Sequence, residues 1–427
     1  MEVLANRNYT KPLHVNPLKL SQPMGAALAF LGIKNCMPLM HGAQGCASFT
    51  KVLFTRHFKD PFPIQTTAVN DITAIIDGGE ISISEAITNI TKKVTPDIVG
   101  LFTTGLTEIK GDDIKGVSML LKDKQRIVYA NTPDFEGGLE SGWAQVVQSV
   151  INQAVEKNGR IDKKKALVIP NVNLTPIEVE KIKESLEDLG FSVFALPDLS
   201  DSLDGHLGVK QGALSGGGIT LEEIKNLGNS ALVITVGESV KKCGEIFQKR
   251  FPKAHIIHVN SLQGLEASDE FYEKIMDFKG DFHVPLRVKR WRSRLQDTLL
   301  DTHFVLGKTK VIVADEPDNA YSISRVLSEA GCKMRAFVSQ KSDILRQFAC
   351  KAEVGDFEDL EDMVNEADLL ISNFHIERIA RKHKKAFLIR GFPDYEQTGA
   401  ALRNNVLYEG SCAFLNECAN VMGHFGH

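Results

Sequence analysis

The sequence predicts an α/β protein in which parallel sheets are flanked by helices. From about residue 95 onward, short apolar runs alternate with amphipathic stretches, as expected for parallel strands joined by crossover helices. A chain of 427 residues is also long enough for about three domains. We place the boundaries near residues 160 and 305, which gives domains at 1–160, 161–305 and 306–427.

The expected strands are the apolar runs of this alternation. Most are rich in valine, isoleucine, leucine or phenylalanine, the composition that suits a buried parallel strand. They are 36–40, 97–104, 126–131, 166–170, 191–197, 231–237, 310–315, 335–339, 367–373 and 385–391.

Two of the helices between these strands carry capping signals at their starts. Thr175 precedes Glu178 by three positions, and Thr220 stands in the same relation to Glu223. Such a threonine accepts a hydrogen bond from the helix backbone, and the glutamate accepts one from the backbone of the threonine. A long helix at 286–304 is expected to link the second and third domains.

Composition and motifs exclude several functions. The formal net charge of -4 offers no basic excess for nucleic acid. The N-terminus has no signal-peptide pattern and the longest apolar run, GAALAFLGI, is too short to span a bilayer, so no membrane role is expected. Seven scattered cysteines fit a reducing compartment, and we expect a cytoplasmic protein. No G-x-G-x-x-G motif follows an expected strand and no P-loop motif occurs, so the sequence does not indicate nucleotide binding.

The most informative segment is CMPLMHGAQGCASFTKVLFTRHF, residues 36–58. After the first strand we expect a glycine-flanked turn at 41–45 and a helix from Ala47. Cys46 would then lie at the helix N-terminus, where unpaired N–H groups and the positive end of the helix dipole stabilise a thiolate or an anionic cluster bonded to it. Gly42 and Gly45 would let the backbone approach a bulky ligand closely.

Three interpretations of Cys46 stay open on this pattern. It could be a small buried residue, or a thiol nucleophile with His41 or His57 as its base. It could also be a metal ligand, and the other ligands would then come from elsewhere, because no C-x-x-C neighbour is present. The remaining cysteines, expected to be core or surface thiols, are Cys36, Cys243, Cys332, Cys350, Cys412 and Cys418.

Eight stretches, in order along nearly the whole chain, carry a resemblance to a known family. They are PLKLSQPMGAALAFLGI, MPLMHGAQGCASF, RHFKDPFPIQTTA, GLFTTGLTEIKGDD, NTPDFEGGLESG, PDLSDSLDGH, LQDTLLDTHF and IRGFPDY. In these stretches the chain resembles the nitrogenase component 1 superfamily. The resemblance implies three Rossmann-like domains with parallel sheets, in agreement with the alternation of strands and helices.

Within that superfamily, the chain is similar to the beta-type subunit of the scaffold on which the iron-molybdenum cofactor matures. The catalytic beta subunit carries three cysteines for its P-cluster, and the matching positions here are Ser21, Cys46 and Gly105. One thiolate suits a [4Fe-4S] cluster whose other ligands come from a partner. The chain is therefore not expected to be catalytic alone. The alternative is a catalytic beta-type subunit of a nitrogenase or of a nitrogenase-like reductase.

The resemblance also implies partners and a site. The implied partners are NifE, which would share the [4Fe-4S] cluster in a two-plus-two heterotetramer, and the Fe protein NifH, bound transiently. An iron-molybdenum cofactor precursor would be held mainly by NifE. Arg56 and His57 are expected at the subunit interface. The residues expected around the cluster are His41, Gly42, Gln44, Gly45 and Gly105.

Five further polar residues follow the strand expected at 97–104. In open parallel sheets ligands gather at the carboxyl ends of strands, but helix capping and loop hydrogen bonds account for such residues equally well. A binding role and a structural role therefore both stay open for them. They are Thr103, Thr104, Glu108, Asp112 and Asp113.

Overall fold

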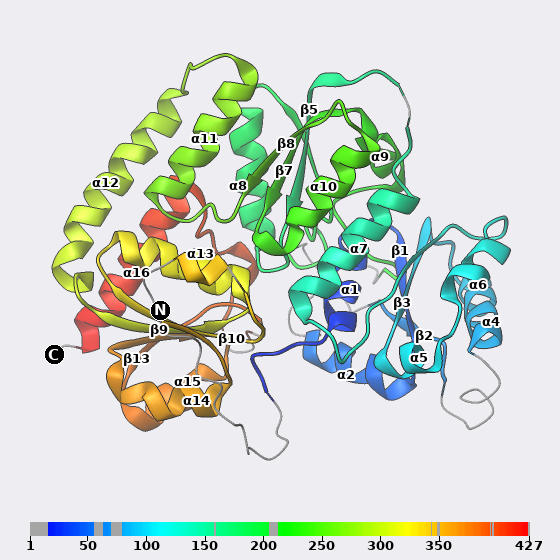
Figure 1. Ribbon diagram of the computed structural model, residues 1–427, viewed down its shortest axis with the longest axis horizontal. Coiled ribbons are helices and arrows are strands. Elements are labelled where there is room, and N and C mark those ends of the chain that lie inside the picture. Colours follow the sequence, from blue (N-terminus) through cyan, green and yellow to red (C-terminus); the bar gives the residue numbers. More distant parts are fainter. Residues whose placement is uncertain are drawn as a thin grey trace.

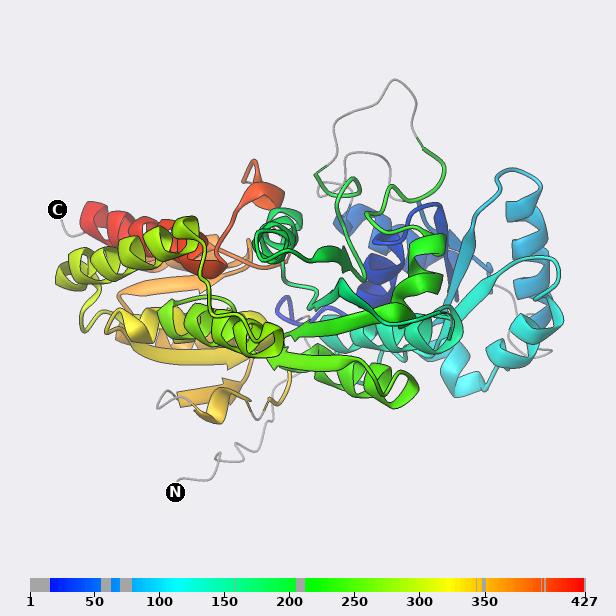
Figure 2. The ribbon, with the colours of Figure 1, turned by 90° about the horizontal axis from the view of Figure 1, so that it is seen from above.

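Three parallel sheets flanked by helices follow one another along the chain (Figure 1). The first sheet lies at one end of the molecule and the third at the other, with the second between them (Figure 2). The predicted fold class is therefore confirmed, whereas the domain boundaries near residues 160 and 305 stay a prediction. The computed structural model describes residues 16–54, 63–69, 79–157, 159–204, 212–342, 344–347, 351–392, 394 and 397–425.

The first sheet has the strand order β2-β1-β3-β4. Its strands are β1 (Cys36–His41), β2 (Gln65–Thr66), β3 (Ile98–Thr103) and β4 (Ile127–Ala130). The chain passes from β1 to β2 on one side and from β3 to β4 on the other, so strand order reverses between β1 and β3. Its helices are α2 (Gln44–Phe54), α4 (Glu80–Thr91), α5 (Gly105–Lys110) and α6 (Ile114–Leu120).

The second sheet repeats this plan with the order β6-β5-β7-β8, which reverses between β5 and β7. Its strands are β5 (Asp162–Pro170), β6 (Ser192–Ala195), β7 (Ser230–Val236) and β8 (His255–Val259). The helices that accompany it are α8 (Pro176–Glu187), α9 (Leu221–Lys225), α10 (Lys241–Arg250) and α11 (Leu265–Lys279). The capping boxes expected at Thr175 and Thr220 begin α8 and α9.

The third sheet has the order β11-β10-β9-β12-β13, which reverses between β9 and β12. Its strands are β9 (Lys310–Asp315), β10 (Lys333–Val338), β11 (Lys351–Val354), β12 (Leu369–Ser372) and β13 (Ala386–Ile389). Its helices are α13 (Pro317–Glu329), α14 (Phe357–Met363) and α15 (Ile376–His383). Short 3-10 turns complete the described elements at Asn226–Asn229, Glu238–Val240, Ile344–Gln347, Val364–Glu366 and Ala400–Leu402.

Long helices join the sheets into one body. α1 (Gln22–Leu31) is buried at every position and packs against α7 (Leu139–Gln153) in a core that the first and second sheets share. A second core joins the second and third sheets. The expected linking helix is α12 (Leu286–Leu306), and it packs beside α16 (Leu407–Phe425) (Figure 1). Among the helices of the described residues, none has both the length and the apolar character needed to cross a membrane.

Buried carboxylates meet where the three sheets adjoin. Glu140 Oε1, at the start of α7, accepts hydrogen bonds from Asn173 Nδ2 and from Asp318 N, both at 2.8 Å. Asp318 in turn accepts from Glu238 N at 3.0 Å and from Ser239 Oγ at 2.6 Å. Burial raises the pKa of Asp318 to about 6. Glu140 and Asp318, which come from either side of the second sheet in sequence, therefore both bind loops of the part of the chain that forms the second sheet.

We expect alkaline pH to destabilise the fold through Glu316, at the end of β9. Burial, aided by the charges of Asp315 and Asp318, raises the pKa of Glu316 to about 8, against about 4.5 when unfolded. Its contribution to stability is thus fully present below the unfolded pKa and is lost as the pH rises through the folded pKa. Urea unfolding between about pH 6 and about pH 8.5 should show a falling free energy of unfolding.

The Glu316→Gln variant should show a weaker fall over the same range, because glutamine does not ionise. Glu245→Gln, on the exposed side of α10, is the matched control and should follow the wild type. If Glu316→Gln and the control had the same pH slope, Glu316 would not be the group responsible.

Candidate metal centre

The turn after β1 meets the end of β3 at the point where strand order reverses in the first sheet. His41 pairs with Thr103 in the register of the two strands. The hydroxyls of Thr104 and Thr107 both donate to His41 O, at 3.1 Å and 2.9 Å. The first turn of α5 is thereby tied to the end of β1. Ligands of open parallel sheets gather at such a reversal, so this turn is placed where a binding site is expected.

The helix that carries Cys46 begins earlier than the sequence indicated. α2 starts at Gln44 rather than Ala47, and His41 still belongs to β1, so the turn between them is only Gly42 and Ala43. Cys46 N donates to Ala43 O at 3.2 Å, which closes the first helical turn. The expected bounds of turn and helix were therefore wrong. Cys46 nevertheless lies in the first turn of a helix.

The side chain of Cys46 is exposed, so the interpretation as a buried residue is wrong. The expected stabilisation of a thiolate is also not observed: partial burial, followed by the negative charge of Asp134, raises the pKa of Cys46. The Asp134 carboxylate accepts a hydrogen bond from Gly105 N at 3.1 Å, so it lies beside both predicted positions. A metal bound by Cys46 must therefore displace the thiol proton.

Sequence reasoning did not single out Asp134. It lies in the quoted NTPDFEGGLESG stretch, a few residues after the strand expected at 126–131. That position, beyond the carboxyl end of a parallel strand, was the available signal.

His41 is buried and both of its ring nitrogens are engaged. Nε2 lies 2.8 Å from Asp112 Oδ2, and Nδ1 lies 2.9 Å from the hydroxyl of Thr67. Burial lowers the pKa of His41, although the hydrogen bond and charge of Asp112 act in the opposite direction. Thr67 Oγ1 also accepts from Gly42 N at 3.3 Å. His41 thus holds the turn in place and has no free nitrogen with which to act as a base for Cys46.

The three predicted glycines have different surroundings. A Cβ atom at Gly42 would lie 2.8 Å from Thr104 Cγ2, and one at Gly105 would lie 3.3 Å from Asp134 Cβ. A Cβ at Gly45 would meet no heavy atom within 4 Å. Open space therefore adjoins Cys46 on the side of Gly45, whereas Gly42 and Gly105 allow close packing of the loops.

The structure places the other predicted residues in different settings. Gln44 is the first residue of α2, while Ser21 directly precedes α1 on a different segment. Arg56 and His57 lie outside the described residues. Cys350 does too, and the cysteines that the structure describes besides Cys46 are buried, as expected for core thiols: Cys36, Cys243, Cys332, Cys412 and Cys418.

The polar residues at the end of β3 and after it form helix caps and loop hydrogen bonds. Thr104 is the capping residue of α5, and Asp113 Oδ1 accepts from Gly116 N at 2.8 Å at the start of α6. Glu108 Oε1 accepts from Thr103 and from Asn131 Nδ2, at 2.5 Å and 2.7 Å. Capping and loop hydrogen bonding account for these contacts, as one of the two interpretations anticipated.

Exposed apolar side chains lie on the two helices of this site. Phe49 and Val52 are on α2, Leu106 and Ile109 are on α5, and Phe135 follows Asp134; we call these five the apolar rim. Val52 is 75% exposed and Ile109 is 79% exposed. Large exposed apolar groups around a candidate site are typical of a surface that another protein covers.

Among the described residues, Cys46 offers a single exposed thiol as a metal ligand at this site. Within the described part of the chain, no group of three or more histidine, cysteine, aspartate or glutamate side chains could hold a metal ion. An exposed thiol with open space beside Gly45 can reach an iron atom held by other ligands.

The contrast between Gly42 in the turn and Gly45 in the first turn of α2 can be tested on the isolated chain. Gly42→Ala should lower the free energy of unfolding by about 1–3 kcal/mol, because its Cβ would overlap Thr104. Gly45→Ala should change it by less than about 1 kcal/mol, since that site is open and helical. Urea unfolding at neutral pH measures both. Equal losses in the two variants would contradict the packing described for Gly42.

Comparisons with known proteins agree with this architecture. The family model described as nitrogenase component 1 type oxidoreductase matches residues 21–423. The nitrogenase iron-molybdenum cofactor biosynthesis protein NifN of Rippkaea orientalis is 38% identical, over 97% of this chain and 95% of that protein. NifN of Bradyrhizobium diazoefficiens is 35% identical, over 97% and 90%. A solved structure of nitrogenase Cp1 at pH 6.5 superposes with a TM-score of 0.91 at 30% identity, over 97% of this chain and 94% of that one. The chain therefore belongs to the nitrogenase component 1 family.

Proposed function

We propose that this chain is a scaffold subunit for the maturation of the iron-molybdenum cofactor, and that Cys46 binds one iron of a [4Fe-4S] cluster shared with a partner subunit. The relatives named NifN, similar over nearly the full length of both chains, support the scaffold role. The observation that carries the cluster assignment is the exposed thiol of Cys46 at the strand reversal of the first sheet. Among the described residues, no further ligands complete a metal site there, and the other three thiolates of such a cluster would come from the partner.

The residues around Cys46 would position it for this task. A bound [4Fe-4S] cluster supplies one-electron transfer. The hydrogen bonds that His41 shares with Thr67 and Asp112 fix the turn that precedes α2. The carboxylate of Asp134 places a negative charge near the thiol, and such neighbouring groups tune the potential of a cluster.

The apolar rim supports a partner that covers the cluster. We infer that NifE is this partner, in a two-plus-two heterotetramer, and that NifH binds transiently to deliver electrons and metal. The cofactor precursor would be held mainly by NifE. Burying the rim beneath NifE would also exclude water from the cluster. We place this assembly in the cytoplasm, where cysteines stay reduced.

A catalytic beta-type subunit of a nitrogenase is the second candidate, because the fold superposes closely on nitrogenase Cp1. An eight-iron cluster needs thiolates that Ser21 and Gly105 do not carry. Gly105 moreover packs against Asp134, which occupies the place beside it. The donor set thus favours the scaffold role.

Replacing Cys46 tests the cluster assignment directly. Anaerobic co-expression with NifE, followed by iron and sulfide analysis and low-temperature EPR of the dithionite-reduced complex, should show the loss of a [4Fe-4S] signal in Cys46→Ala. Ser48→Ala, an exposed neighbour on α2, is the matched control and should retain the signal. A full signal in Cys46→Ala, within an intact heterotetramer, would refute the assignment.

A charge placed in the apolar rim should weaken the complex. We expect Val52→Asp to raise the Kd for NifE by at least about tenfold, because the carboxylate would lose its hydration at the interface. Phe282→Asp, which also changes an exposed apolar residue but lies in the second domain, should have little effect. Size-exclusion chromatography and binding titration measure the two variants. Equal affinity of Val52→Asp and wild type would place the partner elsewhere.

A further inference from the structure

Asp134 is an exposed acidic residue beside the first turn of α5 and close to that of α2. Its Oδ2 accepts a hydrogen bond from the backbone N–H of Gly105, the first residue of α5, at 3.1 Å. Its negative charge also acts on the thiol of Cys46, in the first turn of α2. A partner that reaches a cluster bound to Cys46 would therefore lie against Asp134 as well.

Three members of the apolar rim lie near this carboxylate. Phe135 directly follows Asp134 in the chain, and Leu106 directly follows the glycine that donates to it. Phe49 lies about one helical turn beyond Cys46 on α2. All three side chains are exposed. Asp134 thus brings a negative charge into a surface that otherwise offers large apolar groups to a partner.

The chain itself does little to compensate the charge of Asp134. Within the described residues, Gly105 N is its one hydrogen-bond donor, and no lysine or arginine pairs with it. Partial burial raises the pKa of Asp134, although the hydrogen bond from Gly105 acts in the opposite direction. In the isolated chain the rest of this carboxylate is therefore left to water.

Two other acidic residues at this edge of the first sheet differ from Asp134 in this respect. Asp112 binds His41 Nε2 at 2.8 Å and lies 3.4 Å from Lys110 Nζ, so its charge is compensated within the chain. Glu108 Oε1 accepts hydrogen bonds from two neighbouring side chains. These two carboxylates already have partners, whereas Asp134 would need further donors once water is removed.

A subunit that covers the apolar rim would remove the water around Asp134. Burying an unpaired carboxylate is strongly unfavourable, because the hydration that it loses is not replaced. The thiolate that Cys46 must form in order to bind iron would add a second negative charge nearby. A positively charged side chain on the covering surface would offset both effects. Arginine and lysine are the side chains that supply such a charge at interfaces.

We propose that the partner subunit presents an arginine or lysine side chain to Asp134, so that an ion pair between the two chains lies within the apolar rim beside Cys46. This inference rests on the proposed function, because it takes the surface around Cys46 as the subunit interface. It adds the chemistry that the partner must bring to that surface. An ion pair among apolar groups also fixes how the two subunits are aligned, since other alignments leave both charges buried and unpaired.

The direction in which Asp134→Asn changes the affinity for NifE tests this ion pair. Asparagine has the shape of aspartate and keeps an oxygen that can accept from Gly105 N, but it removes the charge. Opposite a cation, Asp134→Asn should raise the Kd for NifE by at least about tenfold. Asp134→Lys should raise it by at least about a hundredfold, because two like charges would then meet. Anaerobic binding titration of the full chain with purified NifE measures both variants.

Glu136→Gln is the matched control, because it removes the same charge from an exposed position in the same loop, and it should change the Kd by less than about twofold. Circular dichroism verifies that each variant is folded. The ion pair is overturned if Asp134→Asn binds NifE as tightly as the wild type or more tightly, or if Glu136→Gln weakens binding equally. Val52→Asp reports separately on the interface. Weak binding of Val52→Asp beside normal binding of Asp134→Asn would reject the ion pair alone, whereas normal binding of both would reject the interface too.

Discussion

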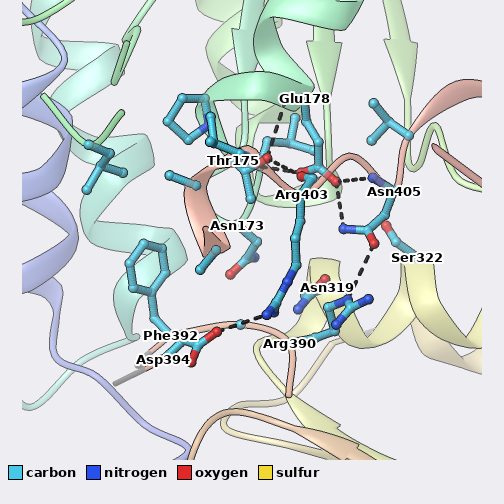
Figure 3. Close-up of a pocket in the computed structure, with 18 of the residues that line it drawn as sticks. Asn173, Thr175, Glu178, Asn319, Ser322, Arg390, Phe392, Asp394, Arg403 and Asn405 are labelled. Carbon is cyan, nitrogen blue, oxygen red and sulfur yellow. Dashed lines mark hydrogen bonds and ion pairs between the residues drawn. The ribbon is translucent and has the colours of Figure 1, made fainter. Parts of the chain in front are cut away.

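The reversal of strand order inside each parallel sheet is the constraint on which the rest of this structure depends. Successive strands are added on one side of a central pair and then on the other, so the segments that leave the pair diverge and open a crevice at the carboxyl edge. In the first sheet that crevice receives the turn before Cys46. In the second and third sheets the two crevices face one another and enclose a cavity of about 670 Å³ (Figure 3). Site positions thus follow from topology before any side chain is considered.

Polar side chains at these edges serve two neighbouring elements at once. Glu178 completes the capping box of α8 through Thr175 and also binds Asn405, which belongs to the segment that follows the third sheet. Glu140 joins Asn173 to the start of α13 in the same way. Because the cap of α8 also binds the segment around Asn405, the stability of this helix depends on how the second and third sheets are packed together. The same hydrogen bonds therefore fix the start of α8 and hold the segment around Asn405 against it.

The interior of the fold could be predicted from sequence because burial there is complete. β1 and β3 are buried at every residue, and a continuous apolar run of this kind can be recognised as a strand from the local sequence alone. The strands that were missed, β2, β8 and β11, each lie at the edge of a sheet, where one side lacks a neighbouring strand. β8 and β11 accordingly include exposed and partly exposed residues. Their sequences, HIIHV and KAEV, do not stand out from loops.

The Cys46 site and the cavity were predictable to different degrees. Cys46 could be found because the glycine-flanked turn and the helix start are local signals. The influence of Asp134 on its thiol could not, since Asp134 follows a different strand and offsets the helix dipole only after folding. The cavity had no local signal at all. Gln263 and Asn173, which line it, look like ordinary loop amides until tertiary packing removes the donors that their oxygens would find in water.

The Cys46 site and the cavity differ in what completes them, and this difference has a thermodynamic consequence. One thiolate cannot hold a cluster, so cluster binding at Cys46 would be linked to subunit association and would strengthen it. The lining of the cavity, by contrast, comes entirely from this chain. A single segment nevertheless touches both: Asp134 contacts Gly105 beside Cys46, and Glu140, six residues later at the start of α7, holds Asn173 of the cavity. This short segment, which leads from Asp134 into the first turn of α7, therefore contributes to the surroundings of both.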